Sequence, residues 1–274
     1  MNIKETITID ELKFLTTKDN AEKVLQELGV PYRKNKIWET LLRNYDYNEY
    51  LKIFRKIAIS DGGKYDTKEI PKLLERRETL IQEYKEKYPN DRNIEWVFNM
   101  DGFDNFRKSE TFGKISYEEF MYGIEKHRLA ASISDITSRV TEITIVSSNE
   151  KIFPTLKNKG GIDYFYEGKE RDLKNSKSLG GLFMDWCKNN NKNSLEEAIS
   201  NPTQVIKCLY EGQSQSRFGS EPRHLIVNLN DEILSNEKLI EKLDNINLDD
   251  EKEITFNHPK TGKSYTTTAL ITYI

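Results

Sequence analysis

The chain has 274 residues, of which 36% are hydrophobic and 32% charged, with a net charge of −3. This length is enough to bury a sizeable core in one domain or two. The sequence contains no run of about 18 apolar residues, and its first residues lack the apolar core of a signal peptide. Only Cys187 and Cys208 occur, without the spacing of a zinc site, which favours a reducing compartment. We therefore expect a cytoplasmic protein without a membrane partner.

The first half of the chain has the periodicity of helices. Apolar residues recur at helical spacing in 10–28, 36–59 and 68–88, and glycine or proline follows each of these stretches. Residues 90–113 are aromatic but irregular and are expected to pack between helices. A further helix is predicted from Ser116 to about Ile143, with a break near 132–134.

The second half changes to a mixture of strand and helix patterns. Buried runs typical of strands are followed by helical stretches, and the strand at 223–229 looks parallel to its predecessor because a helical crossover precedes it. The end of the chain predicts a hairpin, whose turn at Lys260–Ser264 only superficially resembles a phosphate-binding loop. The expected strands are 162–167, 170–174, 223–229 and the hairpin of 253–274; the expected helices are 178–190 and 194–211.

This order of elements predicts an α/β fold with a central mixed sheet flanked by helices. We expect a boundary near residue 115. Residues 1–115 would form a helical region, and residues 116–274 would form the core that carries the candidate site.

Residues 161–174 read G-I-D-Y-F-Y-E-G-K-E-R-D-L-K, with acids on both sides of a Glu-Gly turn. Alternation along a strand places Asp172 and Lys174 on the same face, and hairpin pairing would bring Asp163 toward that face. Two carboxylates can hold a divalent cation through oxygen, with an ammonium group beside it. Residues 151–180 contain seven basic and four acidic residues, a local net charge of +3 that suits a phosphate ligand.

This constellation resembles the PD-(D/E)XK nuclease family, which includes the type II restriction endonucleases. The match consists of Asp163, eight intervening residues and then Asp172-Leu173-Lys174, although Ile162 replaces the proline that the family has before its first acid. The resemblance covers about residues 116–230. It implies that Asp163 and Asp172 bind Mg²⁺, and that Lys174 orients the attacking water or helps to deprotonate it.

Many members of this family add a glutamate on the helix before the hairpin, often after Ser-Arg. Here Ser138-Arg139 is followed by Glu142, which lies 21 residues before Asp163. The resemblance implies that Glu142 is a further catalytic and metal-binding residue. Glu119 and Glu125 remain alternatives on the same predicted helix.

A polar loop at 212–219 has the composition of a base-reading segment. Gln213 and Gln215 could bind adenine, and Arg217 could bind guanine, through paired hydrogen bonds in the major groove. Serine and arginine in the same loop also suit phosphate contacts, which position a protein without specifying sequence. The predicted DNA contacts also include the nearby basic residues Arg223, Lys157 and Lys159.

We therefore expect a magnesium-dependent, sequence-specific endonuclease that cuts double-stranded DNA as a homodimer, without a small-molecule cofactor. The helical region of residues 1–115 would contact DNA or mediate dimerisation. Two alternatives remain open. The same fold could serve a non-specific, repair, junction-resolving or toxin nuclease. The chain could also be a DNA-binding protein without catalytic activity.

Overall fold

The computed structural model describes residues 2–89, 117–157, 162–175, 182–183, 186–187, 189–190, 199–213, 221–227, 234–258 and 261–274. The chain divides into two compact units, Met1–Ile70 with Thr141–Ile274, and Pro71–Val140. The expected boundary near residue 115 lies outside the described residues and stays a prediction. Among the described helices, none is long and apolar enough to cross a membrane.

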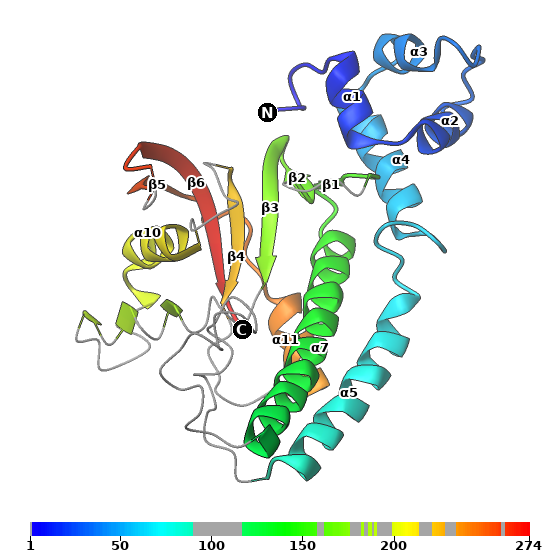
Figure 1. Cartoon of the computed structure of the whole chain (residues 1–274). Coiled ribbons are helices and arrows are strands. Elements are labelled where there is room, and N and C mark those ends of the chain that lie inside the picture. Colours follow the sequence, from blue (N-terminus) through cyan, green and yellow to red (C-terminus); the bar gives the residue numbers. More distant parts are fainter. Residues whose placement is uncertain are drawn as a thin grey trace. The chain divides into compact units, whose positions relative to one another are not determined.

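The first unit contains a six-stranded mixed sheet with the strand order β1-β2-β3-β4-β6-β5 (Figure 1). The first three strands form an antiparallel meander, the pairs β3–β4 and β4–β6 are parallel, and β5 is antiparallel to β6. This arrangement confirms the α/β class and the central mixed sheet. The strands are β1 (Ile152–Pro154), β2 (Tyr164–Tyr166), β3 (Lys169–Asn175), β4 (Arg223–Val227), β5 (Lys252–Asn257) and β6 (Ser264–Tyr273).

A two-residue turn joins β2 to β3 and sets the register of the acidic hairpin. Both central residues have a positive φ, 49° at Glu167 and 86° at Gly168, as in the hairpin turns that match the natural twist of paired strands. A Cβ at Gly168 would lie 2.5 Å from both Asn2 Oδ1 and Lys4 Cβ. The backbone amide of Ile3 donates to the Gly168 carbonyl at 3.0 Å. Glycine is therefore required here by conformation and by space.

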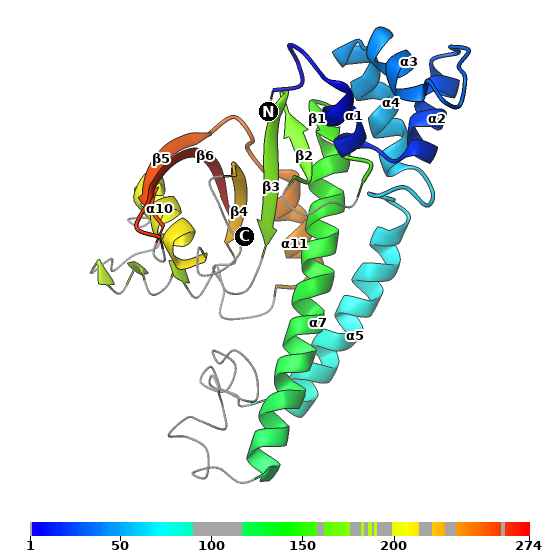
Figure 2. The same ribbon diagram turned by 45° about the horizontal axis from the view of Figure 1, so that its top comes forward.

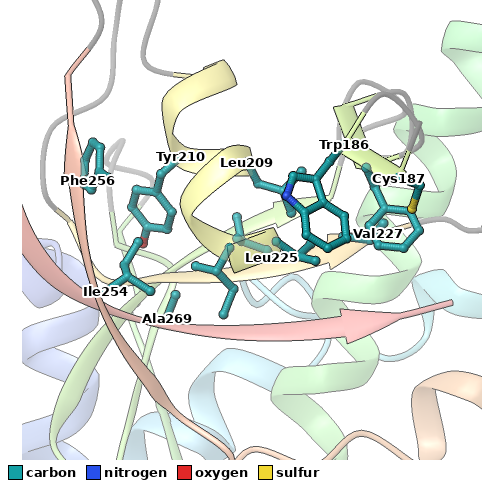
Figure 3. Packing of buried hydrophobic residues seen from close by; sticks show 12 residues of the cluster. Trp186, Cys187, Leu209, Tyr210, Leu225, Val227, Ile254, Phe256 and Ala269 are labelled. Carbon is teal, nitrogen blue, oxygen red and sulfur yellow. The ribbon is translucent and has the colours of Figure 1, made fainter. Parts of the chain in front are cut away.

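Helix α10 (Pro202–Gln213) precedes β4 and packs on one face of the sheet, so the predicted parallel crossover is confirmed. Leu225 and Val227, two residues apart on β4, both lie on this face and meet α10 in an apolar cluster (Figure 3). Within the expected helix over 194–211, Ile199 is helical, Ser200 and Asn201 are not, and α10 begins at Pro202. The cluster consists of Phe183, Trp186, Cys187, Val205, Ile206, Leu209, Tyr210, Leu225, Val227, Ile254, Phe256 and Ala269.

The opposite side of the sheet is covered by α11 (Asn236–Asp244) and by the C-terminal end of α7 (Tyr117–Ser148) (Figure 2). Helix α11 has no counterpart among the sequence predictions. It begins where the Ser235 side chain accepts a hydrogen bond from the Lys238 amide, and its Leu239 and Leu243 are buried. The sheet is therefore the middle of three layers.

The C-terminal hairpin is confirmed. Its register runs from the pair Lys252–Ala269 to the pair Asn257–Ser264. The amide of His258 donates to the Lys263 carbonyl at 2.9 Å, and Gly262 has a φ of 66°. Thr261, Gly262 and Lys263 therefore belong to a hairpin turn and not to a phosphate-binding loop.

The predictions of one helix over 10–28 and one over 36–59 are wrong, because the structure has two helices in each of these ranges. Thr17 accepts a hydrogen bond from the Asn20 amide at 3.3 Å, and Asp46 accepts one from Glu49 at 2.8 Å, so each starts a new helix. Side-chain capping thus overrode the apolar periodicity that runs across these positions. The helices are α1 (Ile9–Leu15), α2 (Lys18–Glu27), α3 (Ile37–Arg43) and α4 (Tyr47–Ile59).

Arg55 of α4 caps the C-terminal end of α7 and so connects helices α1 to α4 with the part of the unit that contains the sheet. Its guanidinium donates to the carbonyls of Val146 at 2.8 Å, Ser147 at 3.0 Å, Asn149 at 2.5 Å and Ile152 at 3.2 Å. The last carbonyls of a helix have no partners within the helix, and they favour a positive charge. Helices α1 to α4 therefore belong to the same compact unit as the sheet.

The second unit contains most of α5 (Glu69–Lys87) and the first part of α7. Helix α5 confirms the prediction for 68–88, whereas the expected break at 132–134 is wrong because α7 is continuous. Ile133 is buried, and its carbonyl accepts both the helical backbone bond and one from Thr137 Oγ1 at 2.8 Å. The buried Arg77 donates to the same Thr137 oxygen at 2.8 Å. Packing against α5 sustains the helix through its serine-rich stretch.

Candidate active site

Strand β3 carries an aspartate and a lysine that form a partly buried ion pair. Lys174 Nζ donates to Asp172 Oδ1 at 2.7 Å. The Asp172 side chain is only 6% exposed, and that of Lys174 is 25% exposed. The structure therefore confirms that both side chains lie on one face of the strand, as their spacing of two residues requires.

Asp163 lies at the same end of the hairpin. It immediately precedes Tyr164, which pairs with Arg171, and Asp172 immediately follows Arg171. The Asp163 amide donates to the Arg171 carbonyl at 2.9 Å, and its Oδ2 accepts from the Leu173 amide at 2.9 Å. The carboxylate of Asp163 thus reaches across to β3 beside Asp172.

The two acids influence each other electrostatically. Burial raises the pKa of Asp172 above its usual value, and the negative charge of Asp163 raises it further. The hydrogen bond and charge of Lys174 oppose this rise, and so does the charge of Arg223. Lysine and arginine thereby favour the carboxylate form in a place where burial disfavours it.

The prediction that Arg223 contacts DNA needs correction, because this side chain is fully buried. Arg223 pairs with Asp172 across β3 and β4. Its guanidinium lies 4.3 Å from the centre of the Tyr210 ring and 3.9 Å from a carboxylate oxygen of Glu221. Arg223 therefore supplies positive charge beneath the site and does not lie on the surface.

Three further residues surround Asp163, and the sequence analysis missed them. Lys64 Nζ lies 4.0 Å from Asp163 Oδ1 and donates to Thr155 Oγ1 at 2.7 Å. The hydroxyls of Thr155 and Tyr65 donate to the Asp163 carbonyl at 3.0 and 2.6 Å. Lys64 and Tyr65 are about a hundred residues from Asp163 in the chain, and no spacing pattern in the sequence connects them.

The donor atoms at this end of the hairpin suit a hard divalent cation. Asp163 Oδ2 accepts from the Leu173 amide and Asp172 Oδ1 from Lys174, while Asp163 Oδ1 lies 4.0 Å from Lys64 Nζ. Asp163 Oδ1 and Asp172 Oδ2 are the oxygens that a cation could bind, with both lysines nearby. Carboxylate oxygens are the ligands that Mg²⁺ prefers, and it usually retains several waters. In the part of the chain that the structure describes, no three His, Cys, Asp or Glu side chains form a group that could hold a metal ion. The two aspartates are thus a small donor set that water and substrate oxygens would have to complete.

Glu142 lies half-buried near the C-terminal end of α7, next to the buried Thr141 and Ile143. Within the described residues it does not complete a three-carboxylate group with Asp163 and Asp172. Its predicted role at the metal stays a prediction. Of the alternatives, Glu125 is exposed on α7, and the side chain of Glu119 lies outside the described residues.

Most of the predicted DNA contacts also lie outside the described residues: Gln215, Arg217, Lys159 and the side chain of Gln213. Gln213 itself is the last residue of α10. Lys157 is partly exposed, and its Nζ donates to the carbonyl of Lys13 at 3.2 Å. The base-reading role of the 212–219 loop therefore stays a prediction.

Comparison with models of protein families, with curated proteins and with solved structures found no match. The resemblance to the PD-(D/E)XK nucleases therefore depends on the hairpin and its surroundings.

Proposed function

We propose that this protein is a magnesium-dependent endonuclease with a restriction-endonuclease-like core that hydrolyses phosphodiester bonds of double-stranded DNA. The observation that carries the proposal is the grouping of Asp163, Asp172 and Lys174 at one end of the β2–β3 hairpin. Two carboxylates can hold a divalent cation, and a lysine beside them can stabilise developing negative charge, so this set suits metal-assisted phosphodiester hydrolysis.

The order of elements around the hairpin supports the same proposal. Helix α7 precedes the meander β1-β2-β3, and α10 then leads to β4, which lies parallel to β3 (Figure 1). The resemblance implied a helix before the hairpin and a helix and strand after it. A fold alone does not establish a function, so the proposal depends mainly on the side chains of the site.

The chemistry follows from the groups that are present. A divalent cation held by Asp163 and Asp172 would supply a Lewis acid that polarises the scissile phosphate and makes a nearby water more acidic. Lys174, anchored on Asp172, would orient the attacking water and stabilise the negative charge that develops on the phosphate. The buried Arg223 favours the ionised form of Asp172, which is the form that binds a cation.

Sequence-specific cutting, Glu142 as a further ligand and a two-fold dimer on a palindromic site belong to the same proposal. The support for Glu142 is the Ser-Arg-x-x-Glu spacing, and the support for sequence-specific cutting is the polar loop at 212–219. The two-fold dimer follows from the proposal of a palindromic site. The basic residues near the hairpin suit the phosphates of such a substrate.

The test is cleavage of several plasmid DNAs with and without Mg²⁺ by the whole chain and by Asp172→Asn. This change keeps the shape of the side chain but removes its charge, so we expect the cleavage rate to fall by about a hundredfold or more. Glu253→Gln is the matched control, because Glu253 is an exposed acid on strand β5 of the same sheet.

Discrete fragments would indicate a site-specific enzyme, and a smear would indicate a nuclease without sequence preference. Near-normal cleavage by folded Asp172→Asn would contradict the assignment. DNA binding without any cutting by the unchanged chain would favour a non-catalytic DNA-binding protein.

A further inference from the structure

The loop between α4 and α5 brings a second lysine to the candidate active site. Lys64 Nζ lies 4.0 Å from Asp163 Oδ1, and its side chain is 10% exposed. Lys174 of β3 lies closer to the other acid, because its Nζ donates to Asp172 Oδ1 at 2.7 Å. Each carboxylate at this end of the hairpin thus has its own lysine.

The position of Lys64 is fixed from several sides. Its Nζ donates to Thr155 Oγ1 at 2.7 Å and lies 4.8 Å from the centre of the Tyr65 ring. Tyr65 in turn donates through its hydroxyl to the Asp163 carbonyl at 2.6 Å. Thr155 and the Tyr65 ring thus hold the Lys64 ammonium group beside Asp163.

The loop itself is tied down by its own hydrogen bonds. The carboxylate of Asp66 accepts from the amides of Gly62 at 2.8 Å and Lys68 at 2.9 Å. The amide of Tyr65 donates to the carbonyl of Ala58 at 2.7 Å. The N-terminal part of the chain therefore presents Lys64 from a well-defined loop.

We infer that Lys64 acts through Asp163: its positive charge balances the carboxylate pair and sets how tightly the site binds a divalent cation. Asp163 keeps its place without Lys64, because its Oδ2 is bound to the Leu173 amide and its backbone is bound to Arg171. Removing Lys64 should therefore change the electrostatic potential at the site more than its geometry. Since this role concerns the cation that the nuclease activity requires, it rests on the proposed function.

The direction of the effect separates this role from a purely structural one. With Lys64→Met the two carboxylates lose one opposing positive charge, so a divalent cation should bind more tightly. We expect the dissociation constant for Mn²⁺, measured by calorimetry on the whole chain without DNA, to fall by about threefold or more. A residue that only supported the fold would weaken the binding when it is replaced.

Two variants serve as controls. Lys64→Arg keeps the charge and should leave the Mn²⁺ dissociation constant within about twofold of the original. Lys68→Met removes an exposed lysine of the same loop, which pairs with Asp61 at 2.8 Å, and should leave it unchanged. If Lys64→Met does not fold, Lys64→Gln removes the charge and keeps a polar group near Thr155.

A metal-free measurement tests the same contact. Lys64→Met and Asp163→Asn should have non-additive effects on the urea midpoint, because each change removes the same interaction. Mn²⁺ binding that is unchanged or weaker in folded Lys64→Met, or strict additivity of the two changes, would overturn the role of Lys64 alone. An unchanged chain that neither binds Mn²⁺ nor cuts DNA would overturn the proposed function and this role with it.

Discussion

His224 illustrates how single residues are fixed across the sheet. The ring lies fully buried, with Nδ1 2.8 Å from the Tyr164 hydroxyl and Nε2 2.9 Å from the Thr272 hydroxyl. Burial lowers the pKa of His224 to about 3, and the nearby charge of Arg171 acts in the same direction. The imidazole is therefore neutral at pH 7 and serves as a hydrogen-bonding bridge between β2, β4 and β6.

This lowered pKa makes stability depend on pH. Below the ordinary pKa of 6.5 the unfolded chain binds a proton at His224 and the folded chain does not, so stability falls as the pH falls from 6.5 toward 3. The expected loss is about 1.4 kcal/mol per pH unit from this group. Urea unfolding at pH 7.5, 6.5, 5.5 and 4.5 measures it.

Two histidine variants separate this effect from the titration of other groups. His224→Gln should be less stable at pH 7.5 but should show a flatter decline below pH 6.5. His258→Gln, in the β5–β6 turn, should decline like the unchanged chain. Equal slopes for His224→Gln and the unchanged chain would show that another group causes the acid sensitivity.

At the scale of elements, the β2–β3 turn holds the acidic hairpin in register beneath the N-terminal segment. Gly168→Ala should destabilise the protein strongly, since the new Cβ meets Asn2 and Lys4 at 2.5 Å and the φ of 86° is already unfavourable for alanine. Gly262→Ala is a matched control, with a φ of 66° and nothing within 4 Å of the new Cβ. We expect about 1–2 kcal/mol for the control from conformation alone, and a clearly larger loss for Gly168→Ala. Chemical denaturation measures the free energy of unfolding of both variants. Equal decreases would show that Asn2 and Lys4 move away from the new Cβ at little cost.

At the scale of the whole molecule, a cation bound only by the folded site should stabilise the entire sheet unit. At a free Mg²⁺ concentration ten times the dissociation constant, the gain in unfolding free energy is about 1.4 kcal/mol. Thermal unfolding with and without Mg²⁺ measures this gain, and EDTA should reverse it. Asp172→Asn should lose most of the gain while Glu253→Gln keeps it; an equal gain in both variants would place the cation elsewhere.

Local chemistry was sufficient for much of this protein. Alternation placed Asp172 and Lys174 on one face of β3, the Glu-Gly pair marked the turn, and apolar runs located β4 and the C-terminal hairpin. These features depend on neighbours within a few residues, so periodicity and turn chemistry determine them. Capping is equally local, yet Thr17 and Asp46 lie inside longer apolar patterns that concealed the helix ends.

Only the tertiary structure decided what surrounds the hairpin. Lys64 and Thr155 reach Asp163 from distant parts of the chain. Arg223 is buried against Tyr210, although the sequence analysis counted it among the DNA contacts. Strand β1, with only three residues, and helix α11 became recognisable once the sheet and its faces were in place. Contacts between distant segments depend on how the sheet and helices pack, and the spacing of residues along the chain does not predict that packing.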